Sequence, residues 1–503
     1  MELIATALDL LQAVPGNRTA VVIPEQGIRV TYDWLRRQVW GMADALAALG
    51  IRRGDRVAMV LPNGLPAIVC FLAASAVGTA APLNPDYRYE EFGFFLRDTN
   101  ARILLCPPHG GEEARRAADG CIPVFPAILG AEGTVYLQGI RTRIPATAPS
   151  AEDIALLLHT SGSTGKPKRV PLQHANLAIS AQNIAQTYKL SPDDVSLCVM
   201  PLFHIHGLVA STLATLISGG TIVVPTRFNP LAFWRLVREY HVTWYTAVPT
   251  VHQLVLGRAG ASDKSGSAGT LRFIRSASTP LAPELMRKME ETFGVPVLEA
   301  YGMTEAAHQM AANPLPPQAR KPGSVGPPSG SVRISVIDDH GNHLGTGQRG
   351  EVVIQGPSVF RGYENAEEAN AQAFLNGWFR TGDQGLLDAD GYLHLTGRIK
   401  ELINRAGEKI APRRIDEVLL THPAVAAAVT FGYAHPLLGE EVAAAVVLRE
   451  PQTESALLAH CRERLADFEC PKKLYIVDSI PQTATGKIRR GEVAAILAGK
   501  KVA

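Results

Sequence analysis

A loop at residues 159–168, HTSGSTGKPK, carries the residue types that bind a polyphosphate. Its glycines let the backbone approach a ligand closely and turn N–H groups toward an anion, and its hydroxyl and lysine side chains add donors and positive charge. An apolar run at 154–158 precedes it and is typical of a buried strand. The loop is not a standard P-loop, because only two residues separate Gly162 from Gly165 and Pro167 follows Lys166. Taken alone, it could also be a flexible surface loop.

Four more motifs follow in order: YGMTE at 301–305, TGD at 381–383, GRIKELI at 397–403 and PQTATGK at 481–487. With the loop, they resemble the motifs of the adenylate-forming superfamily of acyl-CoA synthetases, luciferases and peptide-synthetase adenylation domains. The resemblance extends over nearly the full length of the chain. One position departs from it, since the family loop usually ends Pro-Lys-Gly and Arg169 follows Lys168 here.

The resemblance implies an AMP-forming ligase that uses ATP, Mg²⁺ and coenzyme A. A carboxylate attacks the α-phosphorus of ATP to give an acyl-adenylate and diphosphate, and the thiol of CoA then displaces AMP. The first step brings an anionic nucleophile to an anionic triphosphate, so cations and aligned donors must offset the repulsion. The implied partners are small molecules, with no nucleic acid and no membrane, and the enzyme is expected to be a monomer or homodimer.

Site residues follow from the same resemblance. The phosphate contacts are Thr160, Ser161, Gly162, Ser163, Thr164, Gly165 and Lys168. The adenosine and ribose contacts are Ser278, Ala300, Tyr301, Asp383 and Arg398. Thr304 is assigned to the α-phosphate and Glu305 to magnesium, which prefers carboxylate and phosphate oxygens. Without the family context these motifs would be a solvated loop, a core tyrosine and a simple turn.

The C-terminal motifs are assigned to the moving parts of the enzyme. Lys487 is the candidate catalytic lysine, together with Thr304, Glu305 and His204. Lys400 is the candidate hinge between the two domains, and Gly407, Glu408 and Lys409 would approach CoA after the small domain rotates. Alone, a lysine in a Gly-Lys turn is usually just exposed to solvent.

Polar side chains occur in the segments that flank the acyl site. They are His204, His206, Ser276, Ser278 and His308. Imidazole and hydroxyl groups suit a small polar acid with a second carboxylate, although each histidine alone could be structural. A fatty acid would need an apolar tunnel at this place.

The chain is also similar to plant and fungal oxalyl-CoA synthetases. The matching strings are LHTSG at 158–162, TWYTAVPT at 243–250, LRFIRS at 271–276 and KELINR at 400–405. By this resemblance His206, Ser278 and His308 would hold the distal carboxylate of oxalate. The alternatives are a ligase for malonate or a benzoate-type acid, and an adenylating protein that releases no CoA ester.

The bulk properties are those of an ordinary globular protein. With 503 residues the chain should form at least two domains. Its formal net charge of +2 creates no electric field that would attract nucleic acid or a membrane. The chain lacks an apolar run of eighteen residues, so no membrane span is expected, and its first residues do not resemble a signal peptide. None of the six cysteines forms a close pair in the sequence, and we interpret them as reduced residues of the core. Reduced cysteines are typical of the cytoplasm, so a cytoplasmic protein is expected.

Alternating apolar runs and helical patterns predict an α/β fold. A large domain over 1–399 should contain layered, mostly parallel sheets with helices, and 400–503 should form a small mobile α+β domain. Specific expectations are a helix from Thr31 to Gly50, a strand at 56–61, a helix at 65–77 and a strand at 101–106. After residue 400, strands are expected at 425–431, 442–448 and 474–477, with a helix at 454–465.

Two further segments carry expectations. Residues 257–270 and 313–330 should be irregular because they are rich in glycine and in serine or proline. The GTGQRG string at 345–350 matches a dinucleotide-binding pattern, but a strand rather than a helix is expected after it. It is therefore expected to be a turn between strands.

Overall fold

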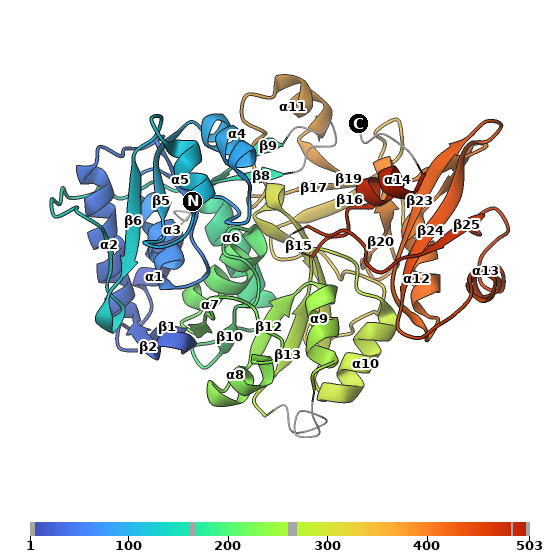
Figure 1. The fold of residues 1–503 in the computed structure, drawn as a ribbon, viewed down its shortest axis with the longest axis horizontal. Helices are drawn as coiled ribbons and strands as arrows, with labels where there is room; N and C mark the ends of the chain where they lie inside the picture. Colours follow the sequence, from blue (N-terminus) through green and yellow to red (C-terminus); the bar gives the residue numbers. More distant parts are fainter. Residues whose placement is uncertain (1–5, 161–166, 260–268, 484–485, 499–503) are drawn as a thin grey trace.

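The structure, a computed structural model, describes residues 6–160, 167–259, 269–483 and 486–498. Within these residues the strands form four sheets, of which three precede residue 399 and one follows it (Figure 1). The predicted architecture of a large α/β domain and a smaller C-terminal domain is confirmed.

The first sheet has seven strands in the order β7-β6-β5-β3-β4-β8-β9, parallel except at its two ends. Its strands are β3 (Arg56–Met59), β4 (Thr79–Pro82), β5 (Ala101–Cys106), β6 (Val124–Leu129), β7 (Val135–Leu137), β8 (Ile154–Thr160) and β9 (Lys168–Gln173). Helices in this part of the chain are α2 (Tyr32–Ala48), α3 (Leu65–Val77), α4 (Tyr89–Thr99), α5 (Glu112–Ala118) and α6 (His174–Thr187).

The second sheet has eight strands in the order β15-β14-β13-β12-β10-β11-β1-β2, parallel except for the end pairs β14–β15 and β1–β2. Its strands are β1 (Thr19–Ile23), β2 (Ile28–Thr31), β10 (Val195–Leu197), β11 (Thr221–Val223), β12 (Trp244–Ala247), β13 (Phe273–Ser276), β14 (Val297–Met303) and β15 (His308–Ala312). Its helices include α1 (Ala7–Gln12), the π-helix η3 (His206–Leu213), α7 (Ala214–Ile217), α8 (Phe233–Glu239), α9 (Pro249–Leu256) and α10 (Pro283–Phe293).

The third sheet differs from the first two, which are mostly parallel as expected. Its strands are β16 (Arg333–Ile337), β17 (Gly350–Gln355), β18 (Phe374–Leu375), β19 (Trp378–Leu387) and β20 (Leu393–Arg398), with α11 (Glu367–Ala373) beside them. All of its pairings are antiparallel. Short turns link β18 to β19 and β19 to β20, and a short turn joins antiparallel neighbours, whereas parallel strands need a crossover. The GTGQRG string is indeed a turn before β17.

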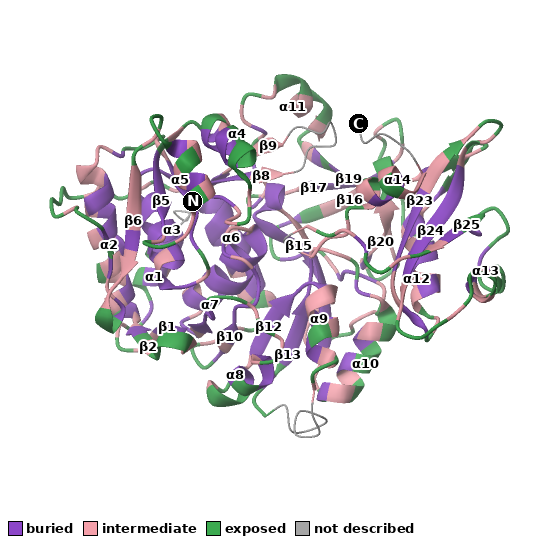
Figure 2. Ribbon diagram, viewed as in Figure 1, coloured by how far each residue is buried: buried purple, intermediate pink, exposed green. Residues whose placement is uncertain are grey.

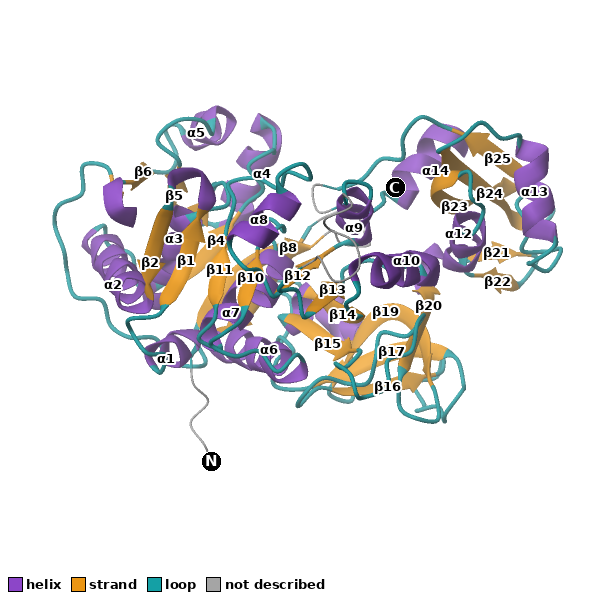
Figure 3. Cartoon of the chain, turned by 90° about the horizontal axis from the view of Figure 1, so that it is seen from below, coloured by secondary structure: helices purple, strands orange, loops and turns teal. Residues whose placement is uncertain are grey.

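The C-terminal region forms a fourth sheet with a core of its own. It contains β21 (Ile403–Arg405), β22 (Glu408–Ile410), β23 (Val425–His435), β24 (Gly439–Leu448), β25 (Lys473–Ile476), α12 (Pro412–Leu420), α13 (Glu454–Arg462) and α14 (Arg490–Ala498). Its two apolar clusters contain no residue from before Ile403. Figure 3 shows this unit at one end of the molecule, beyond β19 and β20. The short turn η6 (Ile399–Glu401) connects the last strand of the large domain to β21.

The predicted bounds of several helices and loops agree with the structure. Thr31 caps α2 by accepting the Trp34 N–H, and α3 spans the expected residues. Residues 313–330 contain neither a helix nor a strand, as expected, whereas 260–268 of the other predicted loop lie outside the described residues. The strands of the two large sheets are buried while outer helix faces are exposed (Figure 2).

The cysteines differ in burial, and the helices are those of a chain without a membrane-spanning helix in its described part. The cysteines are unpaired, but Cys121 is exposed, so the expectation that all six are core residues is wrong for that one. It lies in the exposed turn between the end of α5 and the apolar residues that lead into β6. In the described part of the chain, no helix is both long and apolar enough to cross a membrane.

Candidate active site

The hairpin of β8 and β9 presents the ends of the predicted phosphate loop. Thr160 pairs with Lys168 at its tip. The predicted contacts Ser161, Gly162, Ser163, Thr164 and Gly165 lie outside the described residues. The hairpin therefore fixes where the loop begins and ends.

Arg169, the departure from the family pattern, sits in regular antiparallel pairing opposite His159. Its Nη1 donates to the Asp98 carbonyl at 2.7 Å and lies 3.3 Å from a carboxylate oxygen of Glu364. His159 Nε2 lies 2.9 Å from Asp98 Oδ2. A strand residue needs no glycine here, and the arginine ties the hairpin to α4 and to the segment before α11.

Lys168, Tyr363 and Glu305 form a connected group next to this hairpin. The Lys168 ammonium lies 4.6 Å from the centre of the Tyr363 ring, and the Tyr363 hydroxyl donates to Glu305 Oε1 at 2.8 Å. Glu305 is buried in the short turn η5 (Thr304–Ala306), together with Thr304. Burial raises the pKa of Glu305, and no ion pair with it occurs among the described residues. A buried carboxylate in this state suits an incoming divalent cation.

The predicted ribose residues meet between the second and third sheets. The Tyr301 hydroxyl donates to Asp383, and the Arg398 guanidinium pairs with the other oxygen of Asp383 at 3.0 Å. Asp383 and Arg398 lie opposite each other on β19 and β20. Ala300 is buried beside Tyr301 on β14. The carboxylate is thus fixed between two donors.

Lys487 reaches this group from the C-terminal domain. Burial and the Arg398 charge lower its pKa, while the carboxylates of Glu401, Asp383 and Glu305 oppose that shift. The Thr483 hydroxyl accepts the Lys487 N–H at 3.1 Å, which closes the turn that carries the lysine. The structure therefore places the ammonium group among the predicted nucleotide-binding residues.

The predicted acid-binding histidines cluster together. His204 Nδ1 accepts the His206 N–H at 3.2 Å, His206 Nδ1 lies 3.0 Å from Ser278 Oγ, and the rings of His206 and His308 are 4.9 Å apart. His206 and His308 are fully buried. Burial, and secondly the Lys487 charge, lowers the pKa of His204 to about 4.

The backbone is strained where it presents these groups. Ser278 has φ +73° and His308 has φ +107°, values that side chains with a Cβ rarely adopt. Strain of this kind concentrates at ligand sites. Gly302 lies against His308, because a Cβ at Gly302 would be 2.1 Å from the His308 carbonyl oxygen.

Sequence reasoning missed Arg275 and Thr246 in this cluster. Arg275 is fully buried, and its guanidinium donates to Thr246 Oγ1 at 2.9 Å, to Gln309 Oε1 at 3.0 Å and to His308 Nδ1 at 3.3 Å. Thr246 Oγ1 in turn lies 2.7 Å from His206 Nε2. Both residues lie within the matching strings at 243–250 and 271–276, but those strings assigned them no role. Their signal was a charged residue inside a buried strand.

The other predicted residues are placed apart from the cluster. Ser276 follows Arg275 on β13 and therefore faces the opposite side of the sheet. Lys400 lies in η6, between the last strand of the large domain and the first of the small one. Gly407 and Glu408 lie at the start of β22, and Lys409 there pairs with Asp339 at 3.6 Å. Roles as hinge and CoA contacts stay predictions.

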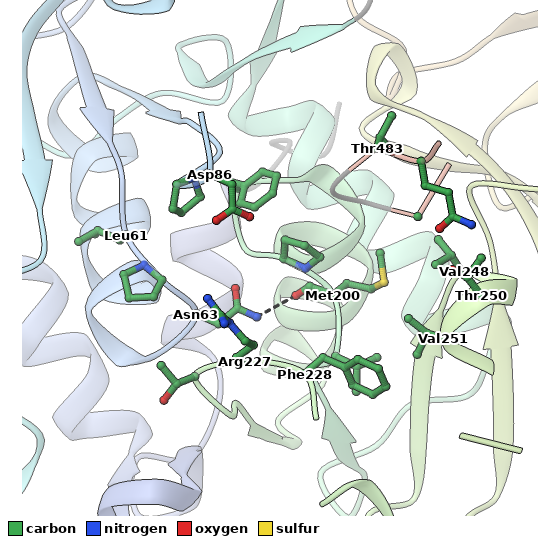
Figure 4. A pocket seen from close by; sticks show the side chains of 18 residues that line it. Leu61, Asn63, Asp86, Met200, Arg227, Phe228, Val248, Thr250, Val251 and Thr483 are labelled. Atoms are coloured by element: carbon green, nitrogen blue, oxygen red, sulfur yellow. Dashed lines mark hydrogen bonds between the residues drawn. The ribbon is translucent and has the colours of Figure 1, made fainter. Parts of the chain in front are cut away.

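A cavity of about 380 Å³ lies between the large domain and the turn that carries Lys487 (Figure 4). Gln482, Thr483 and Gly486 line it from the C-terminal side. Gly486 has φ +79°, and a Cβ there would lie 2.6 Å from Thr250 Oγ1 on α9. Glycine thus lets the Lys487 turn seat against the large domain. Gly407, Glu408 and Lys409 are not part of the cavity lining.

Family models match most of the chain. A model described as AMP-binding enzyme matches residues 11–364, and one described as AMP-binding enzyme C-terminal domain matches residues 414–487. The chain belongs to the AMP-binding enzyme family. This confirms the predicted adenylate-forming resemblance, and the protein is an ATP-dependent acid–CoA ligase that uses ATP, Mg²⁺ and CoA.

Similar proteins with curated names include two oxalate–CoA ligases. The one from Arabidopsis thaliana is 46% identical over 88% of this chain and 89% of its own, and the one from Saccharomyces cerevisiae is 41% identical over 95% and 94%. A sulfoacetate–CoA ligase from Cupriavidus necator is 38% identical over 96% of this chain and 97% of its own. The ATP-bound crystal structure of MatB from Rhodopseudomonas palustris matches with a TM-score of 0.89 at 30% identity, over 98% of both chains.

Proposed function

We propose that this AMP-binding enzyme is an oxalate–CoA ligase, which converts oxalate, ATP and CoA to oxalyl-CoA, AMP and diphosphate. The lining of the acid site carries the proposal. Three polar side chains, the buried His206 and His308 and the half-buried Ser278, converge where a fatty-acid ligase would need apolar contact. The names of the Arabidopsis and yeast relatives support the same acid.

Oxalate suits such a site because it has no apolar surface. It binds as a dianion, one carboxylate reacts, and the other must be held by hydrogen-bond donors. His308 Nε2 is buried and has no hydrogen-bond partner among the residues that the structure describes, so it is available to a ligand acceptor. In the proposed complex, His308 Nε2 and the Ser278 hydroxyl hold the distal carboxylate.

The reacting carboxylate then lies toward His204, Thr304 and Lys487. The Lys487 ammonium offsets the repulsion between the carboxylate and the α-phosphate as the new P–O bond forms and diphosphate leaves. Thr304 donates its hydroxyl to the α-phosphate, while Lys168 and the loop after Thr160 hold the outer phosphates. His204 accepts the His206 N–H at Nδ1, so its proton lies on Nε2, where it can donate.

Asp383 and Glu305 are assigned to the ribose and the metal. Asp383, held by Tyr301 and Arg398, would accept the ribose hydroxyl groups. Glu305 would hold Mg²⁺, which neutralises phosphate charge when bound. Tyr363 fixes the orientation of that carboxylate by donating to Oε1.

Thioester formation requires CoA to reach the adenylate. The mixed polar and apolar cavity behind Phe203 and Val248 offers a route for the thiol arm. Lys487 would leave by rotation about Lys400, and Gly407, Glu408 and Lys409 would then approach the bound CoA. Lys409 must break its exposed ion pair with Asp339 to do so, which costs little.

A panel of acids tests the proposal. Diphosphate release and AMP formation are measured with oxalate, sulfoacetate, malonate, benzoate, octanoate and acetate, each with and without CoA. Oxalate should give the highest kcat/KM, and acetate should be rejected strongly because it leaves buried donors unpaired. A higher kcat/KM for any other acid contradicts the proposal, and diphosphate release without a CoA ester would favour the adenylating alternative.

A single substitution sharpens this test. His308→Ala should raise the KM for oxalate on the order of tenfold or more, with a much smaller change in the KM for ATP, because it removes a donor to the distal carboxylate. His343→Ala is the matched control, since that exposed imidazole lies away from the acid site, 2.7 Å from Ser335 Oγ and edge-on to the Trp378 ring. An unchanged KM for oxalate in His308→Ala would refute this assignment of the acid site.

A further inference from the structure

The buried guanidinium of Arg275 has no carboxylate partner. Its recorded acceptors are Thr246 Oγ1, Gln309 Oε1 and His308 Nδ1, all neutral groups, and no ion pair to it occurs within residues 6–160, 167–259, 269–483 and 486–498. Arg272, three residues earlier, instead pairs with both oxygens of Asp194 at 2.9 and 3.1 Å. An ionised group taken out of water without a counterion is costly. Three neutral acceptors and the Tyr188 ring, 5.8 Å from the guanidinium carbon, surround this charge, so a bound anion would be its first negative partner among the described residues.

The contact with His308 determines where that imidazole carries its proton. Arginine has five N–H donors and no acceptor, so Arg275 can only donate to His308 Nδ1. Nδ1 must then bear the lone pair, and the single proton of the neutral ring lies on Nε2. Within the described part of the chain, His308 Nε2 is buried and has no hydrogen-bond partner. Arg275 thus makes His308 a donor toward the acid site.

A second chain of hydrogen bonds runs from Arg275 to Ser278. Arg275 Nη1 donates to Thr246 Oγ1 and occupies one of its lone pairs, and in the arrangement we infer the Thr246 hydroxyl donates its own proton to His206 Nε2, 2.7 Å away. His206 then carries its own proton on Nδ1 and donates it to Ser278 Oγ at 3.0 Å. The Ser278 hydroxyl proton is left free to point at a ligand. Each of the two chains of hydrogen bonds that start at Arg275 therefore ends on a group that can donate to a ligand, His308 Nε2 in one and the Ser278 hydroxyl in the other.

We propose that Arg275 is the positioning residue for the distal carboxylate of the acid. It fixes the tautomers of His206 and His308, so that the acid site presents hydrogen-bond donors. It also supplies the buried positive charge that favours a dianionic acid. This inference rests on the proposed function, because oxalate is the dianion concerned. Arg275 itself acts through His308 and, by way of Thr246 and His206, through Ser278.

The electrostatics of the cluster agree with this arrangement. Burial lowers the pKa of His308, and the Arg275 charge lowers it further. Burial likewise lowers the pKa of His206, with His308 and then Arg275 adding to the shift. Both rings therefore stay neutral near pH 7, as single donors of fixed direction. The charge that attracts the dianion resides on arginine, which cannot be deprotonated in this range.

Kinetics of Arg275→Gln test the inference. Glutamine retains one N–H donor but no charge. The KM for oxalate should rise on the order of tenfold or more, while the KM for ATP changes less than threefold. Arg272→Gln is the matched control: it breaks a partly buried ion pair from the same segment and should lower the melting temperature without changing the KM for oxalate. Equal oxalate KM values in wild type and Arg275→Gln would overturn the inference.

The wild-type protein offers a second test that needs no stable variant. Enzyme labelled with ¹⁵N-histidine, with signals assigned through His206→Gln and His308→Gln, reports the protonated nitrogen of each ring. His308 should carry its proton on Nε2 and His206 on Nδ1, and the opposite tautomer of either ring would overturn the inference. If the wild type does not use oxalate, the proposed function fails by itself. If it does, and Arg275→Gln retains the oxalate KM, only this inference fails.

Discussion

Replacing Gly302 with alanine should disable the acid site through the backbone. The added Cβ would lie 2.1 Å from the His308 carbonyl oxygen and 2.8 Å from His308 Nδ1, whereas ordinary contact begins at 3.4 Å. The obstructing atoms include backbone, so β14 and β15 must separate by about 1.3 Å at the position that presents the imidazole. A misplacement of about 1 Å costs on the order of a hundredfold in rate.

Initial rates of diphosphate release against oxalate concentration measure this effect. Gly302→Ala should lower kcat/KM on the order of a hundredfold, and overpacking should lower stability by about 1–3 kcal/mol. Gly41→Ala is the control, because a Cβ there meets nothing within 4 Å and alanine favours the helix α2. If Gly302→Ala folds and keeps its kcat/KM within threefold of wild type, the close approach of Gly302 to His308 does not position the imidazole.

Three further outcomes follow from the structure. Lys487→Ala should slow adenylation on the order of a hundredfold or more, yet thioester formation from presynthesised acyl-adenylate should be affected far less; equal losses would refute separate roles of the small domain. Gly486→Ala should impair adenylation in the same selective way, since its Cβ would strike Thr250, and a normal diphosphate burst would exclude this. Burial lowers the pKa of His252 to about 3, so below pH 6.5 the unfolded chain binds a proton that the folded protein does not, and the free energy of unfolding falls on acidification. In urea unfolding, His252→Gln should therefore lose roughly 2 kcal/mol less stability than the wild type between pH 7 and pH 5, and equal losses of stability would contradict this.

Much of the fold follows from local signals in the sequence. The helix that begins after Thr31 and the buried helix at 65–77 were predictable because a capping hydroxyl and continuous apolar residues act within one element. The antiparallel pairing of the third sheet was not predictable from the alternation of apolar runs and helical patterns. The turns between its strands contain no apolar pattern that would reveal how the strands pair. Cys121 similarly lacked a burial signal of its own.

The site was predictable where residues act through a fixed motif. Lys487, Asp383 and Glu305 lie near one another although up to 182 positions separate them, and only the family resemblance indicated this. Arg275 and Thr246 act through contacts between strands, and sequence spacing does not encode such contacts. The tautomers of His206 and His308 depend on those contacts and so could be inferred only from the structure.

The candidate site residues come from each of the three sheets of the large domain and from the C-terminal unit, as far as the structure describes them. Lys168 belongs to the first sheet, His308 to the second and Asp383 to the third, while Lys487 arrives with the C-terminal unit. During refolding, each sheet can therefore regain its secondary structure before any substrate site exists. Catalytic activity should return last, and ATP should protect all the sheets against heat together because it binds only where they meet.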